Sequence, residues 1–136
     1  MLLVDTGVLV GATDQNDPHH ESCAALLEGD PGPLVTSPMV IAEAAYLIDR
    51  ELGPEAELTL YSSILDEGLL VEGMTMADWS RVRELVKRYR DLPLGGTDAS
   101  MIALAERYGV DRVATLDHRH FRVVRPTHVA ALTLLP

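Results

Sequence analysis

The hydrophobic residues of the chain fall into short runs that alternate with longer amphipathic segments. The first run covers residues 2–4 and ends at Asp5, which predicts a short buried strand because three residues are too few for a helix. Thr6 and Gly7 then predict a turn into the apolar stretch 8–10. Further strands are predicted at the short runs 34–36, 69–71, 112–116 and 121–124.

The longer segments carry apolar residues at intervals of three and four, which is the spacing of amphipathic helices. Ser37 before Pro38 predicts one helix start, and the Gly-Pro pair at 53–54 predicts its end. Trp79 is predicted to anchor its helix in the core, and the Thr-Asp pair at 97–98 is predicted to cap another helix. The predicted helices cover residues 20–28, 38–52, 54–66, 76–89 and 97–108.

Short apolar strands that alternate with helices are typical of an α/β protein, in which helices cover both faces of a parallel sheet. In such folds the ligand site lies beyond the carboxyl ends of the strands. Asp5 and Asp117 each follow a predicted strand directly. We therefore expect both carboxylates at the edge of the sheet where a ligand would bind.

The composition suits one compact domain over residues 1–136, with 47% hydrophobic residues and a net charge of −10. The sequence has no apolar run long enough to span a membrane and no segment typical of a signal peptide. A lone cysteine excludes an intrachain disulfide and favours the cytoplasm. The charge is uneven, since residues 1–80 carry a balance of −14 and residues 81–136 one of +4. This asymmetry predicts one face that tolerates phosphates, although basic helix surfaces alone would also explain it.

Four acids, Asp5, Glu43, Asp98 and Asp117, each end or interrupt an apolar segment. Taken singly, Asp98 could cap a helix, Asp117 could cap a turn and Glu43 could face solvent. Because no cluster of Lys or Arg is interleaved with them to form salt bridges, converging carboxylates would need a divalent cation to offset their repulsion. Oxygen ligands favour Mg²⁺ or Mn²⁺ over Zn²⁺, and such an ion can activate water for phosphodiester hydrolysis.

The chain resembles the PIN-domain ribonucleases, and among them the VapC-type toxins of bacterial toxin–antitoxin pairs. The resemblance covers essentially the whole sequence, and its four acids occur in the order of the family. The segments that carry it are LVDT at residues 3–6, SPMVIAE at 37–43, TDASMIA at 97–103 and TLDHRHF at 115–121.

This resemblance implies a three-layer α/β/α sandwich, a Mg²⁺- or Mn²⁺-dependent endoribonuclease, a cognate VapB-type antitoxin and a homodimer. It implies Asp5 and Asp98 as the primary metal ligands, completed by Glu43 and Asp117 directly or through water. Thr6 and Thr115 are expected to orient waters or carboxylates. In-line attack of water would leave 5′-phosphate and 3′-hydroxyl ends. The candidates for RNA contact in the basic second half are Arg81, Lys87, Arg88, Arg119 and Arg122.

Other readings explain less of the sequence. Asp5-Thr6-Gly7 spells the motif of aspartic proteases, but those proteases are strand-rich and would leave the other acids unexplained. A phosphoacceptor or non-catalytic domain could also hold Mg²⁺ in an acidic cluster. Receiver domains need paired acids after the first strand and a Lys near the end, whereas the only Lys here is Lys87. His118 and His120 could contact RNA, but their position predicts exposed turn residues.

Overall fold

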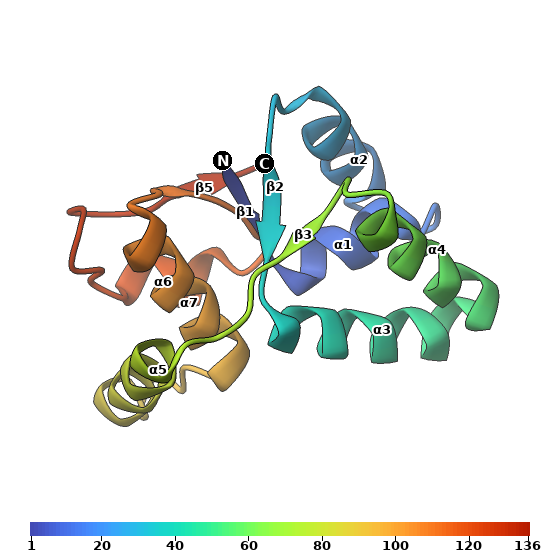
Figure 1. Cartoon of the computed structure of the whole chain (residues 1–136). Coiled ribbons are helices and arrows are strands. Elements are labelled where there is room, and N and C mark those ends of the chain that lie inside the picture. The colour runs from blue at the N-terminus through green and yellow to red at the C-terminus, as the bar shows by residue number, and fades with distance from the viewer.

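The computed structural model describes residues 1–136, and a five-stranded parallel sheet forms its centre (Figure 1). The strands lie in the order β3-β2-β1-β4-β5, and every adjacent pair is parallel. Leu2, Leu3 and Val4 of the central strand are fully buried, as expected for a strand covered on both faces. The strands are β1 (Leu2–Val4), β2 (Leu34–Thr36), β3 (Leu70–Val71), β4 (Arg112–Ala114) and β5 (Thr133–Leu135).

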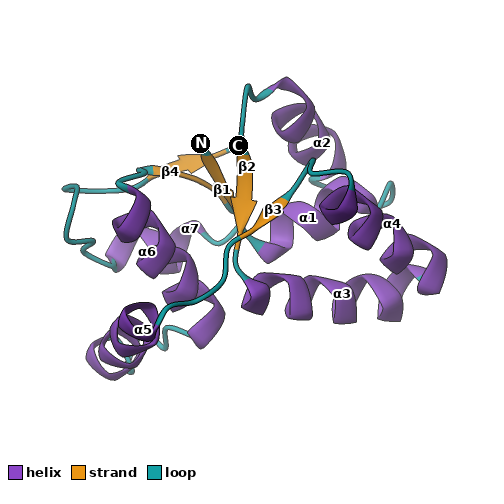
Figure 2. Cartoon of the chain, viewed as in Figure 1, coloured by secondary structure: helices purple, strands orange, loops and turns teal.

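Helices flank the sheet, and most begin and end at the signals present in the sequence (Figure 2). The Ser37 hydroxyl caps α3 by accepting a hydrogen bond from the Val40 amide, and Thr75 caps α5 in the same way. None of the helices is long and apolar enough to cross a lipid bilayer. The helices are α1 (Thr6–Thr13), α2 (His20–Gly29), α3 (Pro38–Leu52), α4 (Pro54–Leu65), α5 (Met76–Arg88), α6 (Gly96–Tyr108) and α7 (His118–Val123).

The strand order reverses its direction once, between β3 and β4. The chain steps outward from β1 through β2 to β3, and then returns past β1 to β4 and β5. Connections between parallel strands are right-handed. The helices α1 to α4, which connect β1 to β2 and β2 to β3, therefore cover one face of the sheet, and α5 and α6, which connect β3 to β4, cover the opposite face. The predicted α/β class with its parallel sheet is confirmed. The reversal also leaves a crevice beyond the carboxyl ends of β1 and β4.

Several local predictions were wrong. Residues 121–124 do not form a strand, because 121–123 belong to α7 and Val124 ends that helix; Asp117 caps its start by accepting a hydrogen bond from the His120 amide. Thr6 and Gly7 are not a turn but the first two residues of α1. Trp79 is 44% exposed and does not anchor the core. In each case the local pattern was ambiguous, and tertiary packing decided the outcome.

Candidate functional site

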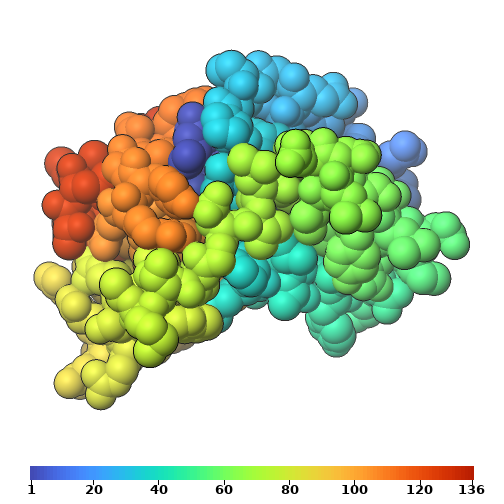
Figure 3. Space-filling view, viewed as in Figure 1, coloured from blue at the N-terminus to red at the C-terminus, as the bar shows by residue number.

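A cavity of about 700 Å³ opens at the carboxyl ends of the central strands, and four of its lining residues are the predicted acids. Figure 3 shows that the lower edge of the molecule, where these ends lie, is hollowed between teal α3 and the yellow-green segment around α5. No Lys or Arg lines this cavity. Its walls are formed by Asp5, Thr6, Gly7, Glu43, Gly95, Gly96, Thr97, Asp98, Leu116 and Asp117.

Four different elements bring the acids together. Asp5 lies in the single-residue link between β1 and α1, and Asp117 lies between β4 and α7. Glu43 is on the second turn of α3, where its side chain is exposed to solvent but faces the cavity. Asp98 is in the first turn of α6. The structure therefore places all four predicted acids around one space, although they span more than a hundred residues of sequence.

Thr115 connects two of the acids. Its hydroxyl donates a hydrogen bond to Asp5 Oδ2 at 2.8 Å and accepts one from the Asp117 amide at 3.0 Å. Both Asp5 and Thr115 are buried. Burial raises the pKa of Asp5 above its ordinary value, and the hydrogen bond from Thr115 offsets part of that rise. Thr115 thus orients the most deeply placed carboxylate of the site.

Asp98 is the acid whose ionisation the site disfavours most clearly. Burial, and after it the charges of Asp5 and Asp117, raise the pKa of Asp98 to about 7. Asp98 was predicted to cap α6 together with Thr97. The residue at the cap position is instead Gly95, and no side chain caps the start of this helix by a hydrogen bond. The Asp98 carboxylate is therefore not used as a helix cap and faces the other acids.

The first turns of α3 and α6 are joined beneath the cavity. The buried hydroxyls of Ser37 and Ser100 are hydrogen-bonded at 2.8 Å, and Ser100 also donates to the Thr97 carbonyl at 2.6 Å. Gly96 approaches α3 so closely that an added Cβ would lie 3.1 Å from the Met39 methyl group. These contacts fix the relative positions of the helices that carry Glu43 and Asp98.

The residues around the cavity fit a divalent cation. Four carboxylates converge on the cavity without a Lys or Arg to neutralise them, and carboxylate oxygens are ligands of Mg²⁺ and Mn²⁺. The Thr6 hydroxyl, on a side chain only 4% exposed, has no hydrogen-bond partner within the protein although it borders the cavity. Buried polar groups normally have partners, so this hydroxyl indicates a bound ligand or its water.

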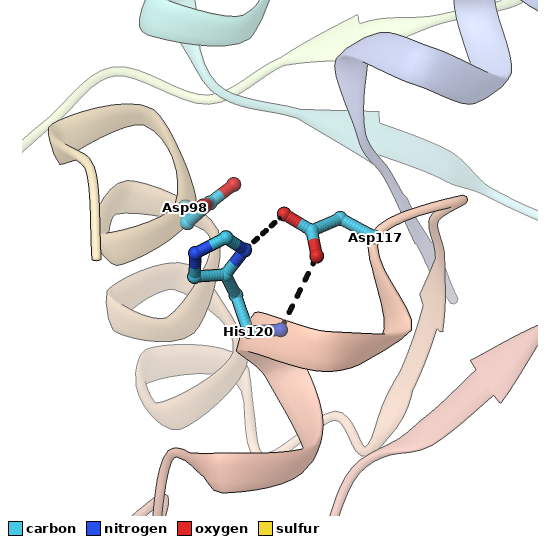
Figure 4. A group of neighbouring side chains, drawn as sticks. All are labelled: Asp98, Asp117 and His120. Carbon is cyan, nitrogen blue, oxygen red and sulfur yellow. Dashed lines mark hydrogen bonds and ion pairs between the residues drawn. The ribbon is translucent and has the colours of Figure 1, made fainter. Parts of the chain in front are cut away.

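The sequence did not reveal the position of His120, which was predicted as an exposed turn residue that could contact RNA. Asp98, Asp117 and His120 each offer a ligand atom, and these three atoms lie within 4.8 Å of one another (Figure 4). His120 Nδ1 lies 2.5 Å from Asp117 Oδ2. Had these residues been predicted as a helix, their spacing would have placed His120 beside Asp117, because residues three positions apart are neighbours on a helix surface. The incorrect strand prediction for residues 121–124 concealed it.

The five basic candidates for RNA contact differ in their surroundings. Arg81 forms two hydrogen bonds with Glu106 and a third with Glu84, so its guanidinium is already paired. Lys87 and Arg88 are exposed at the end of α5, where they border a small polar hollow. Arg119 and Arg122 are exposed on α7.

Both the sequence and the fold of this chain are similar to those of known proteins. A sequence profile of the PIN domain matches residues 2–126. Ribonuclease VapC26 of Mycobacterium tuberculosis is 30% identical over 135 residues, which cover 99% of this chain and 100% of that protein. The crystal structure of VapC20 from the same species, a toxin that cleaves the sarcin–ricin loop, superposes with a TM-score of 0.83 at 21% identity, over 96% of this chain and 99% of that one. FitAcB from Neisseria gonorrhoeae superposes with a TM-score of 0.64 at 17% identity, over 100% and 97%. At these identities the two structures support the fold alone.

Proposed function

Because the chain belongs to the PIN-domain family, we propose that it is a divalent-metal-dependent endoribonuclease of the VapC toxin type. The observation that carries this proposal is the convergence of four carboxylates in a cavity that no Lys or Arg lines. A relative of equal length that is named a ribonuclease supports the choice of RNA as substrate. The structural likeness to a toxin supports only the shared fold.

Asp5 and Asp98 would hold the ion, and Glu43 and Asp117 would complete the site directly or through water. A bound Mg²⁺ or Mn²⁺ would supply an activated nucleophile and neutralise charge that develops on the phosphoryl oxygens. Without such an ion, phosphate could not approach this cavity closely, because its acids repel a phosphodiester.

The chain itself supplies orientation. Thr115 holds Asp5 in one rotamer through its hydrogen bond, and the backbone amide of Asp117 holds Thr115 in turn. The unpartnered Thr6 hydroxyl is placed to bind a water or a substrate oxygen at the cavity wall. The buried Ser37–Ser100 bond keeps α3 and α6 in register. Preorganised ligands of this kind need little rearrangement when substrate binds.

RNA would reach the cavity over the basic second half of the chain. Lys87, Arg88, Arg119 and Arg122 are exposed and suited to phosphate contact. Arg81 is the weakest of the predicted candidates because Glu106 and Glu84 already pair with it. Contacts to phosphate position the strand and do not by themselves select a sequence.

Purified protein provides the direct test. Wild-type protein with Mg²⁺ or Mn²⁺ should cleave RNA internally and leave 5′-phosphate and 3′-hydroxyl ends, and excess EDTA should stop the reaction. Asp5→Asn, shown to be folded by circular dichroism, should be inactive. Cleavage by folded Asp5→Asn at the wild-type rate would overturn the assignment of the site.

The proposal includes a VapB-type protein inhibitor and a homodimer. Apolar side chains that a partner could cover are exposed on α3 and α4, including Tyr46, Leu58 and Leu65, the last of which is 81% exposed. Met76 and Trp79 are exposed on α5. Co-expression with the adjacent reading frame should yield a stable complex that is inactive on RNA. Light scattering on the purified chain should give the mass of a dimer.

A further inference from the structure

His120 brings an imidazole to two of the carboxylates. It projects from α7 toward Asp117 and toward Asp98 on α6, as Figure 4 shows. The potential ligand atoms of these three residues lie within 4.8 Å of one another, so a cation held by Asp98 would lie beside the imidazole, with Asp117 behind the ring. All three side chains are half-buried, which limits competition from bulk water.

Two hydrogen bonds fix the imidazole relative to Asp117. Nδ1 lies 2.5 Å from Asp117 Oδ2, and the backbone amide of His120 donates to Asp117 Oδ1 at 3.2 Å. Nε2 makes no hydrogen bond within the protein. In the neutral ring, a hydrogen on Nδ1 directed at Asp117 leaves a lone pair on Nε2. Histidines that bind metals are held in this way, with one ring nitrogen bonded to a carboxylate.

We propose that His120 is a nitrogen ligand of the cation site and that it gives this protein a preference for Mn²⁺ over Mg²⁺. The inference rests on the metal-dependent function proposed above, and it concerns the choice of ion. Mg²⁺ strongly prefers oxygen ligands and keeps its waters. First-row transition metals accept imidazole as well as carboxylate, so a nitrogen ligand favours them selectively.

A different role for His120 would have the opposite consequence. As a protonated counter-ion of Asp117 and Asp98, the imidazole would occupy the place of the metal, and its removal would strengthen the binding of both ions. The Thr6 hydroxyl has no partner within the protein and borders the cavity that Asp98 and Asp117 also line, which favours a ligand-binding site over a self-neutralised one. The sign of the change in affinity therefore separates the two roles.

The test is isothermal titration of the metal-free full-length protein with MnCl₂ and with MgCl₂. His120→Asn is the main variant, because its amide can still bond to Asp117. His19→Asn is the matched control, since His19 is exposed and does not line the cavity. Asp98→Asn tests the cation site as such. We expect His120→Asn to weaken Mn²⁺ binding by about tenfold or more, with a much smaller change for Mg²⁺ and none in the His19 control.

A spectroscopic measurement reports the ligand directly and does not depend on activity. Electron spin-echo envelope modulation of the Mn²⁺-loaded wild-type protein should show coupling to a ¹⁴N nucleus. This coupling should disappear in His120→Asn. Because a misfolded variant would also lose the signal, circular dichroism of both proteins accompanies it. The wild-type spectrum alone decides the case if the variant fails to fold.

The outcomes distinguish the two proposals. An unchanged ratio of Mn²⁺ to Mg²⁺ affinity in His120→Asn, with binding abolished in Asp98→Asn, overturns the role of His120 and leaves the metal-dependent nuclease intact. Tighter binding of both ions by His120→Asn would identify His120 as a counter-ion of the carboxylates and would also overturn its role as a metal ligand. Failure of the wild-type protein to bind either ion overturns both proposals.

Discussion

The Thr115 hydroxyl donates a hydrogen bond at 2.8 Å to the Asp5 carboxylate, which lies 110 residues earlier in the chain. The bond connects the ends of β1 and β4, the two strands on either side of the crevice. Asp5 is buried, so it has few other ways to compensate for the loss of water. Thr115 is therefore the residue other than the acids themselves that does most to hold the Asp5 carboxylate in place.

Removing the Thr115 hydroxyl should impair catalysis with little effect on the fold. Thr115→Val keeps the shape of the side chain but leaves Asp5 without its hydrogen-bond donor and the Asp117 amide without its acceptor. We expect the rate of RNA cleavage to fall by about 10–100-fold, the range found when supports of metal ligands are removed. Thr115→Ser should restore most of it. Equal cleavage rates for Thr115→Val and the wild type would show that Asp5 does not need the hydrogen bond from Thr115.

Neutralising Asp98 should abolish cleavage and stabilise the metal-free protein. Asp98→Asn removes a ligand and also relieves burial of a charge near Asp5 and Asp117. After allowance for solvent screening this relief is about 1 kcal/mol, which corresponds to a rise of about 3–5 °C in Tm for a domain of this size. Differential scanning fluorimetry in EDTA measures it. Glu28→Gln, an exposed change on α2, should leave both Tm and activity as they are.

The stability of the metal-free protein should fall as the pH rises. The pKa of Asp98 is raised from 3.8 to about 7, and that of Asp5 is also raised. Between these two pH values the folded protein binds more protons than the unfolded chain, so the free energy of unfolding decreases with increasing pH. Tm in EDTA should therefore be higher at pH 5.5 than at pH 8. The slope should flatten in Asp98→Asn, and a slope of opposite sign would contradict the raised pKa values.

The Ser37–Ser100 bond should contribute to stability and to the alignment of the two helices. Ser100→Ala leaves the Ser37 hydroxyl without its buried partner, which costs about 1–3 kcal/mol, while Ser37→Ala also removes the cap of α3. Urea denaturation of both single variants and of the double variant forms a thermodynamic cycle. We expect the free energy of unfolding to fall less in the double variant than the sum of its decreases in the two single variants. Additive losses would show that the two hydroxyls act independently.

Arginines of the basic half should separate into two groups on substitution. Arg88→Gln should weaken RNA binding and reduce its dependence on salt concentration, because an exposed phosphate contact is lost. Arg81→Gln should instead destabilise the fold, because it leaves Glu106 without its half-buried partner. Filter binding of RNA at several salt concentrations and urea denaturation measure the two effects. A reduced salt dependence in Arg81→Gln would place that residue on the RNA path after all.

Local signals in the sequence determined much of the fold. The runs at residues 2–4 and 34–36 could only be short strands, and Ser37-Pro38 determined where α3 begins, because caps and hydrophobic spacing act over a few residues. The same signals placed Asp5 and Asp117 at strand ends. The order of the four acids was enough to suggest the PIN-domain family, which the match over residues 2–126 confirms.

Tertiary structure alone decided the contacts between distant segments. The folding of residues 118–123 into α7 brought His120 to Asp117 and Asp98, whereas the local pattern favoured a turn followed by a strand at 121–124. Packing of α5 against α6 paired Arg81 with Glu106 and left Trp79 exposed. The hydrogen bonds from Thr115 to Asp5 and between Ser37 and Ser100 exist because parallel strands end at one edge. Such contacts depend on three-dimensional packing, which spacing along the chain does not encode.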